Sequence, residues 1–230
     1  MQAVAAARVF PRFAIVKPET SPRRITMAET RIYLASRSPR RRELLKQIGI
    51  GFDVLLLRED LRRGADVDET PLAAEGPADY VLRLARAKAE VSARQLLQRG
   101  LRAHPVLAAD TTVVLDGATI GKPVKAEEAV RILAALSGRQ HEVLTAVALA
   151  HKGQVEARIS VSTVEFRPLT EIEIRRYVAT GEPFDKAGAY AIQGRAAAFV
   201  TRISGSYSGI MGLPLAETAE LLMHFDIEAL

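Results

Sequence analysis

The sequence predicts an α/β fold, with a mixed, twisted sheet flanked by helices and two lobes around a central cleft. In the first half of the chain, strand-like apolar segments alternate with helical patterns, which is typical of parallel strands joined by helices. The second half is richer in hairpins, chiefly over residues 141–166, and adds antiparallel strands. Hydrophobic residues make up 48% of the 230 residues, enough for the core of one domain.

The composition excludes several classes of protein. There is no Cys, which rules out disulfides and thiolate metal sites and fits a reducing compartment. The four His are scattered and form no zinc pattern. No apolar run is long enough to span a bilayer.

The positive charge is concentrated in an N-terminal tail. Of the net charge of +5, four units come from residues 1–26, which hold five basic residues and one acidic residue. The remaining domain is therefore nearly neutral, which argues against a general nucleic-acid binder. We expect residues 1–30 to be a disordered or dispensable basic extension, or an over-long start, with a transit peptide as the alternative. Residues 31–230 form the predicted domain.

The first strand and helix frame a candidate anion site. We expect a buried strand over residues 31–35 and a helix from Pro39 to about residue 48, with Ser38 as N-cap and Gly49 after the C-terminus. This helix N-terminus combines free N–H groups and the positive end of the helix dipole with hydroxyl and guanidinium groups. A polyphosphate fits that set. The alternative is a capped helix with a solvated basic first turn. The side chains concerned are Ser36, Ser38, Arg40 and Arg41.

The next segment contains a long polar loop. Residues 52–57 are predicted as a buried strand, and residues 58–78 as a loop with an acidic cluster at Asp66, Asp68 and Glu69. Loops of this length in compact domains are often functional. A helix is expected over residues 79–99. It carries Lys88, whose ordinary interpretation is solubility.

A carboxylate interrupts the third predicted strand, over residues 106–115. Asp110 lies in the middle of this apolar run, where a charge is costly unless it is paired or binds a metal. We therefore interpret it as functional. A hairpin turn at residues 116–117 follows, and then Lys122 in a stiff loop.

The second half supplies the remaining elements. We expect a helix over residues 126–136, hairpin strands over 141–150 and 154–166, a helix over 171–178, a strand over 199–203, a turn over 205–209 and a last helix ending near residue 225. Thr170 and Glu173 form a capping box. The small-residue loop 185–194, with Lys186 and Gln193, either lets a flat ligand approach the backbone or is an ordinary glycine loop.

This inventory suits the hydrolysis of a phosphoanhydride. Such a reaction needs hard oxygen ligands for Mg²⁺ or Mn²⁺, cations for the phosphate oxygens, and a carboxylate that positions water. The chain has no Walker A loop and no kinase signature.

Seven motifs in order resemble one family, the Maf nucleoside triphosphate pyrophosphatases. They are LASRSPRR (34–41), ADT (109–111), GKP (121–123), LSG (136–138), DKAGAY (185–190), IQG (192–194) and GLPL (212–215). The resemblance implies cleavage between the α and β phosphates, a divalent cation, and a cytoplasmic house-cleaning role against abnormal nucleotides. It also implies a fold related to the inosine triphosphatases and a homodimer.

Residue roles carry over from the matching positions. The resemblance makes Asp110 the catalytic acid, described as the proton acceptor for water, and a metal ligand together with Glu69, with Asp68 as the rival for the second acid. Whether Asp110 is chiefly base or chiefly ligand stays open. The substrate-binding positions are Ser36, Ser38, Arg40, Arg41, Lys88, Thr111, Lys122, Lys186 and Gln193.

Three positions distinguish the branches of the family. Arg40, Thr111 and Gln193 look like the branch acting on dTTP and UTP, and a Gln amide can pair with the carbonyl and N3–H edge of uracil or thymine. Modified pyrimidine triphosphates or a wider substrate range are alternatives. A different class of function is a non-catalytic nucleic-acid-binding or division-regulating protein. We expect no stable nucleic-acid partner and no membrane association.

Overall fold

The computed structural model describes residues 31–57 and 66–229. The expected N-terminal extension, residues 1–30, and part of the long polar loop, residues 58–65, lie outside the described residues.

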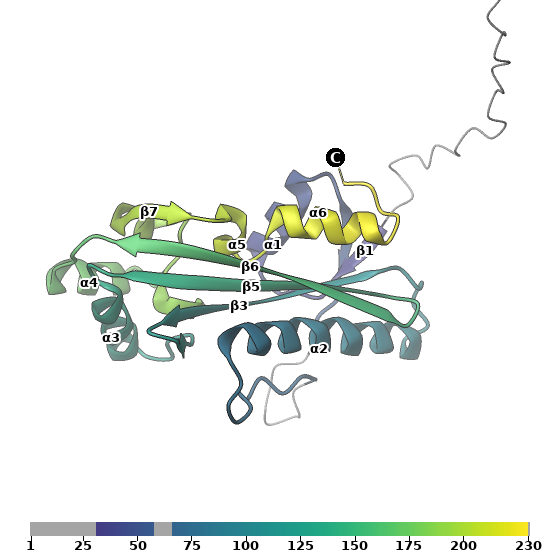
Figure 1. Cartoon of the computed structure of the whole chain (residues 1–230), viewed down its shortest axis with the longest axis horizontal. Coiled ribbons are helices and arrows are strands. Elements are labelled where there is room, and N and C mark those ends of the chain that lie inside the picture. Colours follow the sequence, from purple (N-terminus) through teal and green to yellow (C-terminus); the bar gives the residue numbers. More distant parts are fainter. Residues whose placement is uncertain (1–30, 58–65, 230) are drawn as a thin grey trace, which may run out of the picture.

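A mixed sheet of seven strands forms the centre of the described chain (Figure 1). Its order is β2-β1-β3-β5-β6-β7, and β4 pairs with the remaining edge of β3. The β1 strand runs parallel to β2 and β3, and every other pair is antiparallel. This confirms the predicted fold class. The strands are β1 (Arg31–Leu34), β2 (Gly51–Val54), β3 (Val106–Leu115), β4 (Ala118–Ile120), β5 (Gln140–His151), β6 (Gln154–Phe166) and β7 (Val200–Ser204).

Helices cover both faces of the sheet (Figure 1). The long α2 lies along one face, α1 and α6 lie on the other, and α3 and α4 lie together at the far end of the long strands. No helix in the ranges 31–57 and 66–229 is both long and apolar enough to cross a membrane. The helices are α1 (Pro39–Gln47), α2 (Pro77–Gln98), α3 (Ala126–Leu136), α4 (Glu171–Val178), α5 (Tyr207–Met211) and α6 (Leu215–His224), with 3₁₀ turns η2 (Ala187–Ala189) and η3 (Arg195–Phe199).

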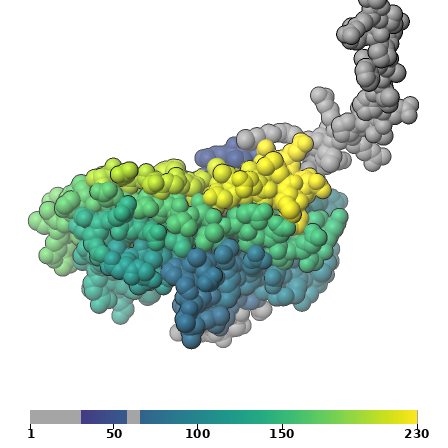
Figure 2. Space-filling view, viewed as in Figure 1, coloured from purple at the N-terminus to yellow at the C-terminus, as the bar shows by residue number. Residues whose placement is uncertain are grey.

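Strand alternation divides the core between the two faces. Successive side chains of a strand point to opposite faces. Leu107 and Ala109 therefore pack with α1 and α6, whereas Val106 and Ala108 pack with α2. A third cluster, centred on Phe166, fills the end covered by α3 and α4. Figure 2 shows side chains filling the space between the visible elements, with α2 below the sheet and α6 above it.

Local sequence signals place the helix ends as predicted. Ser38 caps α1 and accepts a hydrogen bond from the Arg41 amide at 3.5 Å, with Pro39 at the first helical position. Gly49 follows the C-cap with a φ of +72°, a conformation that glycine adopts without steric cost. Thr170 and Glu173 form the full capping box of α4.

Four predicted segments differ in detail. The segment 52–57 is not a buried strand, because β2 ends at Val54 and is the largely exposed edge strand of the sheet. The helix predicted over 79–99 begins two residues earlier, at Pro77, and the strand predicted over 199–203 spans Val200–Ser204. The turn predicted over 205–209 leads into α5, because Ser206 caps a short helix through the Gly209 amide.

Candidate active site

An unpaired stretch of one strand edge creates the cleft. The β1 strand pairs with β3 only at Val106 and Leu107, and β4 pairs with the same strand from Val113 onward. In the described chain, no other strand pairs with the edge between them. The cleft opens there and has a volume of about 860 Å³. Ligands of open α/β sheets bind at such places, beyond the carboxyl end of a parallel strand.

Arg41 occupies part of this free edge. Its Nη1 donates to the Ala109 carbonyl at 2.7 Å, where a neighbouring strand would otherwise donate. Its Nε donates to the Gly212 carbonyl at 2.7 Å, and its Nη2 donates to Thr111 Oγ1 at 3.2 Å. The guanidinium therefore joins α1, β3 and the end of α5. It gives the cleft floor a positive charge while its donors are used by the protein.

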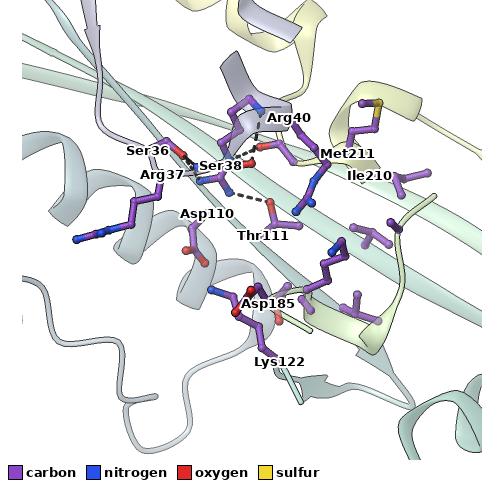
Figure 3. A pocket seen from close by; sticks show the side chains of 18 of the residues that line it. Ser36, Arg37, Ser38, Arg40, Asp110, Thr111, Lys122, Asp185, Ile210 and Met211 are labelled. Carbon is purple, nitrogen blue, oxygen red and sulfur yellow. Dashed lines mark hydrogen bonds between the residues drawn. The ribbon is translucent and has the colours of Figure 1, made fainter. Parts of the chain in front are cut away.

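The segment between β1 and α1, residues 35–38, forms one wall of the cleft and is called the serine loop here (Figure 3). The Ser38 amide donates to Ser36 Oγ at 3.1 Å, and Ser38 then caps α1. Ser36 is buried. The two hydroxyls and the positive end of α1 thus face the cleft from one side, as the sequence pattern predicts.

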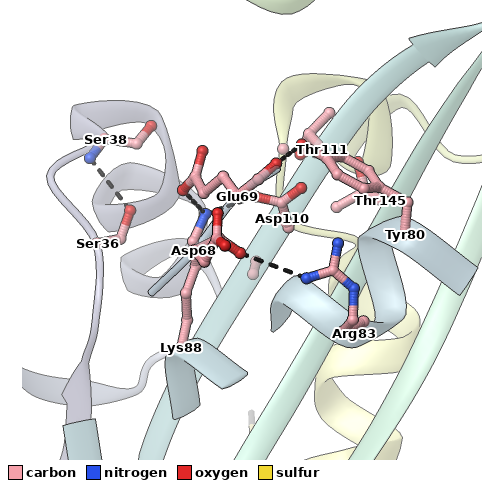
Figure 4. A network of polar contacts seen from close by, with 12 residues as sticks. Ser36, Ser38, Asp68, Glu69, Tyr80, Arg83, Lys88, Asp110, Thr111 and Thr145 are labelled. Atoms are coloured by element: carbon pink, nitrogen blue, oxygen red, sulfur yellow. Dashed lines mark hydrogen bonds and ion pairs between the residues drawn. The ribbon is translucent and has the colours of Figure 1, made fainter. Parts of the chain in front are cut away.

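Lys88 links two carboxylates at the centre of the site (Figure 4). Its Nζ lies 2.7 Å from Asp110 Oδ1 and 2.6 Å from Glu69 Oε1. The Lys88 side chain is 16% exposed and that of Asp110 13%, so the solubility interpretation of Lys88 is wrong. Lys88 on α2 thus contacts Asp110 on β3 and Glu69 on the loop before α2. The buried acid in β3 has a cationic partner, which offsets the cost of burying its charge.

Charge pairing sets the ionisation of this cluster. Burial by itself would lower the pKa of Lys88, but the charges of Asp110 and Glu69 raise it above its usual value. Burial opposes ionisation of Glu69, yet Lys88, and then Lys122 and Arg41, hold its pKa below the usual range. Lys88 and Glu69 therefore stay charged at neutral pH.

Asp68 and Glu69 differ in where their side chains lie. The Asp68 carboxylate accepts from the Thr70 amide at 2.9 Å and is exposed, whereas Glu69 lines the cleft. Tyr80 donates its hydroxyl proton to the Glu69 carbonyl at 3.0 Å. Arg83 donates to Glu75 at 2.6 and 2.8 Å and to the Thr70 carbonyl at 3.1 Å.

Tyr80 and Arg83 thus hold the loop that carries Glu69, a role that the sequence analysis missed. Their spacing of three residues on one helix face, beside a polar loop, was the available signal.

Two cations that line the cleft, Arg40 and Lys186, lie close enough to repel one another. Burial lowers the pKa of Arg40, and burial together with the charge of Arg40 lowers that of Lys186. Asp185 and Lys122 lie on the same side of the cleft in Figure 3. Two partly desolvated cations that repel one another favour a bound anion between them. Lys186 donates to the Phe184 carbonyl at 3.2 Å.

The remaining predicted residues, Gln193 and Thr111, also line the cleft. Gln193 is exposed there, next to the buried wall formed by residues 190–192. Thr111 Oγ1 accepts from Arg41 and from Thr145 Oγ1, the latter at 3.0 Å, and lines the cleft floor. All the predicted site residues thus line this cleft: Ser36, Ser38, Arg40, Arg41, Glu69, Lys88, Asp110, Thr111, Lys122, Lys186 and Gln193.

The carboxylates fit a hard divalent cation that shares its coordination with substrate. Residues 31–57 and 66–229 contain no group of three or more His, Cys, Asp or Glu able to enclose a metal. Magnesium is commonly held by one or two carboxylates together with waters and substrate phosphates. Glu69 and Asp110 supply that number of carboxylates, and both contact the Lys88 ammonium.

Known proteins resemble this chain over nearly all of its described residues. The profile of Maf-like proteins matches residues 31–225. The dTTP/UTP pyrophosphatase of Nitrosomonas europaea is 60% identical over 198 residues, covering 86% of this chain and 96% of that protein. The protein of the same name from Aromatoleum aromaticum is 61% identical with the same coverage. That of Dechloromonas aromatica is 53% identical over 200 residues, covering 87% and 100%.

The Ham1 protein of Staphylococcus aureus, a solved structure, aligns with a TM-score of 0.45 and 16% identity, covering 85% of this chain and 97% of that one. With a profile match over residues 31–225 and relatives more than half identical over most of both chains, this chain belongs to the family of Maf-like proteins.

Proposed function

We propose that this chain hydrolyses dTTP and UTP between the α and β phosphates, releasing the nucleoside monophosphate and pyrophosphate. The observation that carries the proposal is the cluster of Lys88, Glu69 and Asp110 facing a cationic wall across one cleft. A triphosphate has the charge to bridge the two sides. The names of the curated relatives support the choice of dTTP and UTP.

The basic side chains bind the triphosphate in this proposal. Arg40 and Lys186 neutralise phosphate oxygens between them, which relieves their mutual repulsion. Ser36 and Ser38 donate from the serine loop, and Lys122 approaches from the loop after β4. Arg41 acts through its charge, because protein acceptors already hold its N–H groups.

Glu69 and Asp110 would hold Mg²⁺ or Mn²⁺. When bound, such a cation neutralises phosphate charge and favours the deprotonation of an attacking water. Asp110 Oδ1 accepts from Lys88, which leaves Oδ2 to orient a water and to accept its proton. The P–O bond between the α phosphorus and the bridging oxygen breaks as the water oxygen bonds to the α phosphorus, and the cations stabilise the departing pyrophosphate.

Gln193 contacts the base in this proposal. Its amide can donate to a carbonyl and accept from N3–H of uracil or thymine, whereas guanine presents donors at that edge. The homodimer and the cytoplasmic location stay predictions from the resemblance, and the absence of a nucleic-acid partner stays a prediction from the nearly neutral charge of the domain.

The test is pyrophosphate release from dTTP, UTP, CTP, GTP and 7-methyl-GTP, with and without Mg²⁺ or Mn²⁺. We expect metal-dependent release from dTTP and UTP that is lost in Asp110→Asn. Activity on purines only would overturn the role of Gln193, and inactivity on all five would overturn the proposed reaction. A DNA-binding assay titrated with salt tests the regulatory alternative, because binding to a phosphate backbone weakens steeply with salt.

A further inference from the structure

One carboxylate behind the cleft holds the segment that carries Gln193. Glu182 Oε1 accepts from the Tyr177 hydroxyl at 2.9 Å and from the Ala196 amide at 3.4 Å, and Oε2 accepts from the Arg195 amide at 3.1 Å. It thereby satisfies the first free amides of η3, which has no side-chain cap of its own.

Tyr177 completes the arrangement from the other flank. Its hydroxyl oxygen accepts from the Ala191 amide at 3.3 Å while donating to Glu182. Ala191 precedes Gln193 by two residues and Arg195 follows it by two. The pair of Tyr177 and Glu182 therefore fixes the backbone on both sides of Gln193.

The Glu182 carboxylate lies very close to the backbone at Gly194. Its φ of −104° and ψ of −152° are extended, so its backbone conformation does not require glycine. A Cβ at this position would overlap Glu182 Oε1 and lie 2.6 Å from Cδ and 2.7 Å from Oε2. A side chain at position 194 would therefore push the Glu182 carboxylate out of its present position.

Packing and burial hold Tyr177, and with it the hydrogen bond to Glu182, in one position. Tyr177 is buried and packs edge to face against Phe199, with ring centroids 5.1 Å apart. Burial and then Glu182 raise the pKa of Tyr177, which keeps its hydroxyl protonated as a donor. Residues 190–193 line the cleft, whereas Tyr177 and Glu182 do not.

We propose that Glu182 and Tyr177 are positioning residues that set the base specificity of this enzyme by fixing the backbone around Gln193. The inference rests on the proposed function. Within the described chain the Gln193 amide has no hydrogen-bond partner, so its placement depends on the backbone that carries it. The proposed phosphate-cleaving cluster lies on β3, α2 and the loop before α2, outside this network. Loosening the pair should therefore change base selection and leave bond cleavage intact.

The first test measures steady-state kinetics of Tyr177→Phe and Glu182→Gln with dTTP, UTP, CTP and GTP. We expect KM for dTTP and UTP to rise about fivefold to tenfold, the effect of one lost hydrogen bond. We expect kcat to stay within about twofold, so that the preference for dTTP over GTP falls by the same factor as KM rises. Tyr207→Phe and Glu171→Gln are matched controls on exposed side chains and should leave both constants unchanged.

The second test is a double-mutant cycle between Gly194 and Glu182. Gly194→Ala alone should impair dTTP selection and lower the melting temperature, because its Cβ displaces the carboxylate. In the Glu182→Ala background the same substitution should cost much less. Additive effects would overturn the explanation of the glycine.

Two outcomes overturn the proposal while the proposed function stands. One is a lower melting temperature in Tyr177→Phe and Glu182→Gln with unchanged KM and selectivity, which indicates a purely structural role. The other is an equal fall of kcat on all four substrates. Failure of the proposed function looks different, because the wild-type chain itself would then lack activity on dTTP and UTP.

Discussion

The ammonium group of Lys88 lies 2.7 Å from Asp110 Oδ1, and this contact joins the middle of α2 to the free edge of β3. A buried carboxylate alone would be protonated or expelled, because the low-dielectric interior disfavours its charge. Lys88 places a positive charge beside the acid and fixes one of its oxygens. Glu69, half-exposed on the other side of the same ammonium, completes a charged cluster that opens toward the cleft.

Replacing Asp110 with Asn should stop turnover and keep the fold. The amide fills the same volume but cannot accept the proton of water or hold a cation as a carboxylate does. We expect a loss of kcat of about 10²–10⁴-fold, the range measured for a positioned acid or base. Pyrophosphate release and thermal unfolding check it, with Asp116→Asn, an exposed acid of the β3–β4 turn, as control. A near-normal rate in Asp110→Asn would refute the assignment.

Lys88→Met should weaken both folding and activity at neutral pH. It leaves two carboxylates side by side without their shared cation, which we expect to cost about 1–3 kcal/mol in the free energy of unfolding, since the site is partly exposed. Mg²⁺ or Mn²⁺ should raise the melting temperature of this variant more than that of the wild type. Urea unfolding with and without the cation measures both effects. Lys46→Met, on the exposed surface of α1, is the control, and equal stability of the two variants would contradict the prediction.

The neighbouring arginines should respond differently to replacement by Lys. Arg41→Lys loses the planar fork that serves the carbonyls of Gly212 and Ala109, so we expect a loss of about 2–3 kcal/mol in unfolding free energy. Arg40→Lys keeps a cation at the outer cleft and should leave stability nearly unchanged while raising KM for triphosphates. Urea denaturation and kinetics on the two variants separate the roles, and the reverse pattern would refute them.

Gln193→Glu should raise KM for UTP and dTTP without loss of stability. The carboxylate cannot donate to a pyrimidine carbonyl and repels electron-rich oxygens, which we expect to cost about tenfold in kcat/KM. The side chain is exposed in the cleft, so the melting temperature should not change. Gln154→Glu, at the exposed first residue of β6, serves as control. Unchanged kinetics on both pyrimidine nucleotides would remove Gln193 from base recognition.

His141 should make the fold sensitive to mild acid. It is 2% exposed and lies 2.9 Å from the Tyr190 hydroxyl, and burial lowers its pKa from 6.5 to about 4. Between pH 6.5 and about pH 4, His141 is protonated in the unfolded chain but neutral in the folded chain. The free energy of unfolding therefore falls as the pH falls through this range. Relative to pH 7.5, we expect a loss of about 2 kcal/mol at pH 5 from this group.

His141→Gln should flatten that pH dependence, because it removes the titrating ring and keeps a polar partner for Tyr190. Urea unfolding at pH 7.5 and pH 5 measures the difference, with the exposed His224→Gln as control. Glu173, whose pKa its bonds to Arg167 and Thr170 lower to about 2, affects stability only below about pH 4.5, outside this window. An unchanged pH slope in His141→Gln would contradict the prediction.

Much of the architecture follows from short-range patterns. Ser38 with Pro39, and Thr170 with Glu173, specify helix starts through contacts within a single turn, and the structure places both as predicted. The motif resemblance specified the family. The edge position of β2 was missed because an apolar segment has the same pattern whether or not a layer covers it.

By itself, the sequence determined the class of fold, the helix caps, the acid in β3 and the set of polar residues that share one cleft. Only the tertiary structure decided which of them meet. It placed Glu69 rather than Asp68 beside Lys88, used Arg41 to complete the edge of β3, and set Glu182 behind Gln193. The reason is physical: caps and periodicity arise from residues a few positions apart. Contacts between distant residues depend on strand register and on which loop the packed helices bring back to the sheet.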